Sequence, residues 1–199
     1  MTPWRTALMR YIEVEARPVE KFGHQVRLLA LTAQIGEALA YDGDIVCAAT
    51  WLHDLGVFTG HRPEEPGKLE AWDNVLYAMA RTPGLLTGFG FPSEKVAAVV
   101  ECIRTHQPHL DPQTVEATIL RDADILEQLG AIGAMRTICK VGRDTRFHTF
   151  TDAVTSLRRA LHTLPGLLRL DASKVLAAPR IETLRLFVDA VDAEAQVLL

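Results

Sequence analysis

Apolar residues recur at the spacing of an α-helix along nearly the whole chain of 199 residues. No stretch shows the strict alternation of β-branched or aromatic residues with polar ones that is typical of a strand. The pattern therefore predicts an all-α protein, and the length is sufficient to bury a core without disulfides or a structural metal. Proline, glycine and capping residues divide the chain into predicted helices at 3–16, 19–41, 45–54, 68–81, 93–106, 113–129, 131–141, 150–164, 167–177 and 179–199.

Charge and hydropathy exclude several classes of protein. The formal net charge is −4 and there is no run of basic residues, so we expect no nucleic-acid partner. No window approaches the roughly 18 consecutive apolar residues of a membrane-spanning helix, and the first residues do not resemble a signal peptide. We therefore expect a cytoplasmic protein with no membrane association, in which Cys47, Cys102 and Cys139 are buried, reduced thiols.

The chain shows no internal repeat and no composition typical of a linker. We therefore expect a single domain over residues 1–199, with a C-terminal helical extension at 147–199. The main irregular segment, residues 56–67, is rich in glycine, proline and charge, and it is long enough to form a lid or a site loop.

An almost entirely apolar predicted helix, residues 45–52, runs directly into the pair His53-Asp54. Burial of this ionisable pair is costly unless the two groups bind something, and metal coordination is one solution. The alternative is that Asp54 caps a turn and His53 is a hydrogen-bonded core histidine. His24 lies on another apolar helix, and Arg27 shares its face at a spacing of three residues.

Two further carboxylates, Asp122 and Asp124, lie inside an otherwise apolar predicted helix. One histidine, a His-Asp pair and one aspartate on separate helices can build a metal site in the core of a helical bundle. Asp122 and Asp124 point about 200° apart around the helix, so both cannot face the same ion. Periodicity does not choose between them, because each has apolar neighbours.

The order His24, His53-Asp54, Asp124, with the phrases AATWLHDLG and LRDADILEQLGAIGAMR, resembles the HD-domain superfamily of metal-dependent phosphohydrolases. The match is best to small bacterial all-α members whose last motif reads DAD-x-L-x-x-L-GA-x-G. The resemblance runs from about residue 19 to 136 and implies an HD-domain helical bundle, with a core at about 19–146 and additional C-terminal helices. It also implies one divalent metal ion, Mn, Co, Ni, Fe, Zn or Mg. The ligands it implies are His24, His53, Asp54 and Asp124, with Asp122 as a supporting carboxylate.

The activity that this resemblance implies is hydrolysis of a phosphate ester or anhydride of a small molecule, by analogy a nucleotide, by a metal-activated water. Asp54 is then both a ligand and the group that steers or deprotonates the water. The phosphate needs cations, for which Arg27 is the first candidate and Lys68, Arg104 and Arg136 follow. Each of the last three is equally well explained as a solvated surface charge.

Three other histidines lie near the motif in sequence. In similar proteins a histidine at a position comparable to His106 faces the substrate or a second metal, so the resemblance implies a catalytic role for His106. His109 and His61 are weaker candidates, because histidines in exposed loops are usually inert.

One departure from the family pattern bears on the number of metals. Dinuclear members carry further histidines between the His-Asp pair and the final aspartate, whereas the predicted helix 68–81 contains none. The departure favours a mononuclear hydrolase. The segment Trp72-Asp73-Asn74 in this region is open to two interpretations, a substrate contact or local packing.

Two other functions remain open at this point. An iron-dependent oxygenase or lyase can use the same scaffold, and a ligand-binding or regulatory domain can keep the metal as a structural element. A homodimer is also left open by the sequence.

Overall fold

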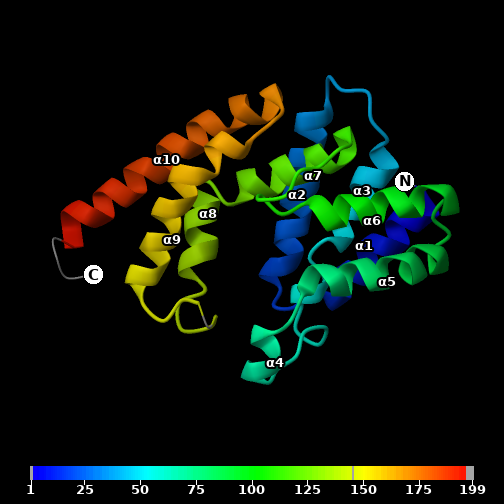
Figure 1. Ribbon diagram of the computed structural model, residues 1–199, viewed down its shortest axis with the longest axis horizontal. Helices are drawn as coiled ribbons and strands as arrows, with labels where there is room; N and C mark the ends of the chain where they lie inside the picture. The colour runs from blue at the N-terminus through cyan, green and yellow to red at the C-terminus, as the bar shows by residue number, and fades with distance from the viewer. Residues whose placement is uncertain (1, 145, 196–199) are drawn as a thin grey trace. The chain divides into compact units, whose positions relative to one another are not determined.

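The structure, a computed structural model, describes residues 2–144 and 146–195 (Figure 1). Regular structure in these residues is helical apart from one isolated β-bridge between Thr59 and Arg62, so the all-α prediction is confirmed. None of these helices is long and apolar enough to cross a membrane. The α-helices are α1 Pro3–Glu15, α2 Glu20–Gly36, α3 Gly43–Leu52, α4 Pro66–Glu70, α5 Asn74–Gly88, α6 Val96–Thr105, α7 Val115–Glu127, α8 Gly130–Ile138, α9 Phe150–Thr163 and α10 Asp171–Ala195.

The chain divides into two compact units, Met1–Arg121 and Asp122–Leu199, and the division falls inside α7. The two units are called the first and the second unit below. That the whole chain is one domain with an extension from residue 147 remains a prediction.

Helix α3 is the central element of the first unit and packs against α1, α2 and α6. It begins where the Asp42 carboxylate accepts hydrogen bonds from the backbone N–H groups of Asp44 and Ile45. Every residue from Val46 to Leu52 is buried, as the apolar sequence predicts. The helix ends at Leu52, two residues before the predicted end, so His53 and Asp54 follow the helix instead of lying within it.

The helix predicted at 68–81 is wrong, because the structure has two helices there, α4 and α5. The Asp73 carboxylate accepts hydrogen bonds from the backbone N–H groups of Val75 and Leu76 and so begins α5. The predicted helix end at residue 81 is also wrong, since α5 continues through Pro83 to Gly88.

The helix predicted at 93–106 begins later than predicted. Ser93 begins the short 3-10 helix Ser93–Lys95, and α6 starts at Val96. Helix α6 packs against both α3 and α5, which completes the bundle of the first unit.

Helices α8, α9 and α10 pack against one another in the second unit. Helix α9 begins with a capping box, in which Thr149 and Asp152 each accept a backbone hydrogen bond from the other. The two helices predicted at 167–177 and 179–199 are in fact one helix, α10, with Pro179 inside it; residues 196–199 of the prediction lie outside the described residues.

Two of the three cysteines, Cys47 and Cys102, are buried as predicted. The prediction is wrong for Cys139, which follows α8 and is exposed.

Candidate metal centre

His53 immediately follows the last residue of α3 as its C-cap, and its ring is 1% exposed. Its Nδ1 lies 2.9 Å from the carbonyl oxygen of Thr50. A carbonyl oxygen only accepts, so Nδ1 carries the proton and donates it, and the neutral ring has its lone pair on Nε2. This Nε2 atom is buried and makes no hydrogen bond within the described residues. A buried nitrogen lone pair without a hydrogen-bond partner is the arrangement expected of a metal ligand.

His24 and Asp54 lie next to this nitrogen. His24 is on the buried face of α2 and is 2% exposed. One carboxylate oxygen of Asp54 lies 3.8 Å from Nε2 of His24, and the other lies 3.8 Å from Nε2 of His53. The Asp54 carboxylate therefore faces both imidazole rings, whose centroids are 5.6 Å apart.

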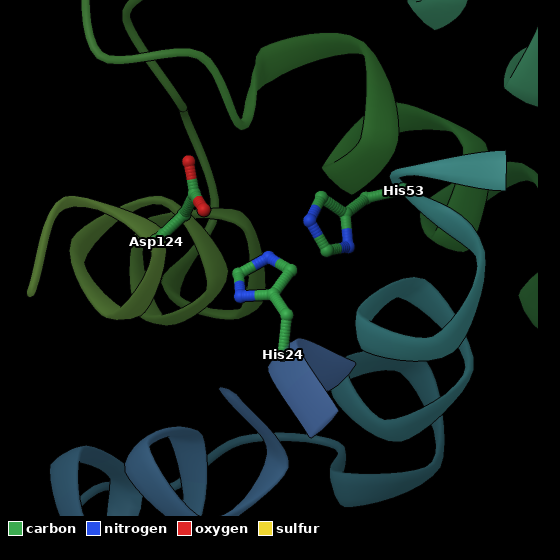
Figure 2. A group of neighbouring side chains, drawn as sticks. All are labelled: His24, His53 and Asp124. Atoms are coloured by element: carbon green, nitrogen blue, oxygen red, sulfur yellow. The ribbon is translucent and has the colours of Figure 1, made fainter. Parts of the chain in front are cut away.

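Asp124 brings a carboxylate oxygen close to the ring nitrogens of His24 and His53. The ligand atoms of His24, His53 and Asp124 lie within 4.8 Å of one another, and Figure 2 shows the three side chains pointing together. Helix α7 is continuous from Val115 to Glu127, so Asp124 lies on it one turn after Arg121. The Asp124 carboxylate also accepts a hydrogen bond of 3.1 Å from the Nε2 amide of Gln128.

Asp122 has a different environment from Asp124. Its carboxylate is fully buried and accepts hydrogen bonds from the backbone N–H groups of Arg169 and Leu170, the latter at 2.9 Å. These two residues immediately precede α10. The carboxylate of Asp122 is therefore engaged with the backbone of the second unit, as expected of a structural group.

His106 joins the group at the end of α6, where it is 4% exposed. Its Nδ1 lies 2.6 Å from the carbonyl oxygen of Ile103, so this ring too carries its proton on Nδ1 when neutral. Its centroid is 5.0 Å from that of His53. Ligand atoms of His53, Asp54 and His106 again lie within 4.8 Å of one another, so these three residues are a second set that could hold an ion.

Opposing influences act on the Asp54 carboxyl group. Burial by itself raises its pKa, but Coulombic attraction to His53, Lys21, His24 and His106, with the imidazoles protonated, lowers it, and the net pKa is far below the usual value. Lys21 was not among the residues selected from the sequence. It lies three residues before His24 on α2, the same spacing that selected Arg27, and this spacing would have found it.

Three of the four cations predicted to bind substrate lie on three different helices, and the fourth, Arg104, is exposed on α6 and pairs with Glu101 at 2.6 Å. Arg27 shares α2 with His24 and is half-buried. Lys68 is exposed on α4 and pairs with Glu65 at 3.0 Å. Arg136 is on α8 and pairs with Glu127 at 3.3 Å. Arg27 alone of the three thus lies on a helix that carries a predicted metal ligand.

The segment after Asp54 is held by specific hydrogen bonds. His61 is largely buried, with Nε2 2.8 Å from a Glu15 carboxylate oxygen and Nδ1 3.0 Å from the Tyr77 hydroxyl. Trp72 donates from its indole N–H to the carbonyl oxygen of Gly56 at 2.8 Å. Local packing therefore accounts for Trp72, and His61 fastens the loop to α1 and α5. His109 is exposed in the loop after α6.

The helical fold and the grouped His, His-Asp and Asp side chains define the class of protein. The family model of the HD domain matches residues 22–129, more than half of the chain, and the chain therefore belongs to the HD-domain family. The resemblance noted in the sequence is confirmed. No curated protein matches the chain.

Solved structures of low sequence identity share the fold. YpgQ of Bacillus subtilis in complex with ADP is 20% identical, with a TM-score of 0.74 over 96% of this chain and 94% of that one. An HD-superfamily hydrolase of Bacillus thuringiensis is 19% identical, with a TM-score of 0.71 over 97% of each chain. A predicted HD superfamily hydrolase of an uncultured Thermotogales bacterium is 20% identical, with a TM-score of 0.66 over 96% of this chain and 93% of that chain.

Proposed function

We propose that this protein is a metal-dependent phosphohydrolase that cleaves a phosphate ester or anhydride of a small molecule, with a nucleotide as the substrate. The observation that carries the proposal is the buried Nε2 of His53, which makes no hydrogen bond within the described residues although carboxylates and a second imidazole surround it. Two imidazoles with two carboxylates match the donors that Mn, Fe, Co, Ni, Zn or Mg accept.

In this proposal His24, His53, Asp54 and Asp124 hold one divalent ion. The ion would supply Lewis acidity, which polarises a phosphoryl oxygen and eases the deprotonation of water. The hydrogen bond from His53 Nδ1 to Thr50 supports the assignment, because metal-binding histidines commonly donate their other N–H to a carbonyl or carboxylate. The backbone hydrogen bonds of Asp122 support a structural role for that carboxylate.

The protein side chains would move the protons. Water attacks phosphorus as the bond from phosphorus to the leaving oxygen breaks, and Asp54 accepts the proton that the water loses. The pKa of Asp54 lies far below its usual value, so the group is a carboxylate at neutral pH and can orient the attacking water by accepting a hydrogen bond from it. His106 holds its Nδ1 proton toward Ile103, which leaves Nε2 to carry the proton that the leaving oxygen takes up.

The cations of the chain would bind the phosphate. Arg27 is our first candidate, because it shares α2 with His24 and its planar guanidinium suits phosphate oxygens. Lys68 and Arg136 remain predictions, and each must exchange a carboxylate partner for the substrate. The ADP bound by YpgQ of Bacillus subtilis supports a nucleotide as the ligand class.

The test is hydrolysis of a nucleotide panel and an aryl phosphate by protein loaded in turn with Mn, Co, Ni and Mg, with metal content measured on the same samples. We expect phosphate release by the wild type and its loss in Asp54→Asn. Absence of release with every metal would refute the proposal. Iron-dependent oxygen consumption would favour an oxygenase, and a metal needed only for folding would favour a binding domain.

The ligand assignment has a matched pair of variants on α7. Asp124→Asn should weaken Mn binding at least about tenfold, because it removes a charged ligand. Asp122→Asn should instead lower the free energy of unfolding by about 1–3 kcal/mol, because it weakens the hydrogen bonds to Arg169 and Leu170, and leave the Mn affinity unchanged. The reverse pattern would exchange the roles of the two aspartates.

A further inference from the structure

Lys21 differs from the other lysines of the chain. The remaining four each have a partner within the described residues: Lys68 pairs with Glu65, Lys95 with Asp42 and Asp44, Lys174 with Asp171, and the Lys140 ammonium lies over the ring of Phe147. The Lys21 ammonium makes no hydrogen bond or ion pair within the described residues, and its side chain is half-buried. A cation that is partly removed from water and makes no hydrogen bond or ion pair within the described residues is available for a ligand.

The position of Lys21 on α2 places it beside the candidate metal centre. Lys21, His24 and Arg27 follow one another at intervals of three residues and so lie along one side of the helix. The Arg27 guanidinium reaches back along α2 toward Gly23, where a Cβ atom would lie 3.3 Å from its Nη1, so its charge, like Lys21, lies toward the start of α2 from His24.

The electrostatics of Asp54 agree with this placement. The charge of Lys21 is second only to that of His53 among those that lower the Asp54 pKa. The ammonium therefore lies within electrostatic reach of the carboxylate, although the two groups form no ion pair of 4.0 Å or less within the described residues.

We propose that Lys21 binds a phosphoryl oxygen of the substrate, and that Lys21 and Arg27 together select substrates with two or more phosphates. This inference rests on the proposed function. The two cations complement each other, because lysine is a compact charge with three donors and arginine is a planar fork. Two cations beside the candidate metal centre match the larger negative charge of a di- or triphosphate better than that of a single phosphate.

The experiment compares Lys21→Met, which keeps most of the side-chain length, with Lys21→Arg and with the control Lys174→Met. The control position, Lys174, is an exposed surface residue of the second unit. The dissociation constant of ADP is measured by calorimetry with metal-free protein, at several NaCl concentrations. The KM and kcat for nucleoside mono-, di- and triphosphates are measured with the metal-loaded protein, and Mn affinity is measured separately.

We expect Lys21→Met to weaken ADP binding and to raise KM for di- and triphosphates roughly 10- to 100-fold, the range for one charge-assisted hydrogen bond. The monophosphate should be affected less, and the salt dependence of ADP binding should become shallower. Lys21→Arg should recover part of the affinity. Lys174→Met should match the wild type, and Mn should bind Lys21→Met at least as tightly, because a nearby positive charge has been removed.

The outcomes separate this inference from the proposed function. If the wild type hydrolyses nucleotides and Lys21→Met binds ADP as tightly as the wild type, the inference is wrong and the proposed function stands. If the wild type hydrolyses nothing, the proposed function fails, and the ADP affinities still decide whether Lys21 binds phosphate. The inference would be overturned if Lys21→Met bound Mn more weakly than the wild type. It would also be overturned if the KM rose equally for mono-, di- and triphosphates, because either result would show a structural role for Lys21.

Discussion

Replacement of Gly56 by alanine should strongly destabilise the segment that follows Asp54. A Cβ atom at Gly56 would lie 2.3 Å from the backbone oxygen of Asn74 and 2.7 Å from its Cα. Both are backbone atoms at the start of α5, so the clash cannot be relieved by a rotamer change. Overpacking of this kind costs about 1–3 kcal/mol, and loss of the Trp72 hydrogen bond to the Gly56 carbonyl would add about 1 kcal/mol.

The assay is thermal unfolding of metal-free protein, so that ligand binding does not contribute. For a chain of this length each kcal/mol lowers the Tm by about 2–4 °C, and the expected decrease is roughly 4–16 °C. Gly67→Ala, on α4, is the matched control, because a Cβ atom at Gly67 would meet nothing within 4 Å. Alanine there should leave the Tm unchanged or raise it, since it favours helix. Equal Tm values for Gly56→Ala and the wild type would refute the reasoning.

Two further predictions concern the second unit and the thiols. In the native protein only Cys139 should react with a thiol reagent at neutral pH. Cys139 is exposed, whereas burial raises the pKa of Cys102 to about 12. Reaction of the native Cys139→Ser variant with the reagent would contradict this prediction. The Arg146 guanidinium lowers the pKa of Asp144 to about 2, so Asp144 stabilises the fold above about pH 4 and this contribution is lost as the pH falls through about 2. Asp144→Asn should therefore lower the free energy of unfolding by at most about 1 kcal/mol at pH 7, since Arg146 is largely exposed, and should not change it below pH 2. A difference in Tm that does not depend on pH would exclude this pair as the cause.

Local sequence signals predicted the helices well where they agreed with the packing. The apolar run of α3 located that helix to within two residues at each end. The errors arose where a residue type has two roles. Asp73 lies inside the predicted helix 68–81 but caps the start of α5 in the structure. Pro83 and Pro179 fall at predicted helix boundaries but lie inside α5 and α10.

The candidate site was predictable to the extent that its residues follow the motif. His53 and Asp54 stand out because an ionisable pair ends an apolar helix. The choice between Asp122 and Asp124 could not be made from periodicity, because the partners of Asp122 are backbone groups 47 and 48 residues away. The spacing to His24 could have selected Lys21, but whether its ammonium forms an ion pair within the described residues depends on which carboxylates the fold brings near it.

The hydrogen bonds of the two imidazole rings at the ends of α3 and α6 affect which amino-acid substitutions the site tolerates. His53 and His106 each donate a hydrogen bond to the carbonyl oxygen of the residue three positions earlier. These carbonyl groups belong to the last turn of a helix, where no backbone N–H of the same helix can donate to them. Each ring is thus oriented by main-chain atoms and depends little on the identity of the neighbouring side chains. Substitutions around the rings can therefore accumulate without misaligning them, provided that each helix still ends at the same residue.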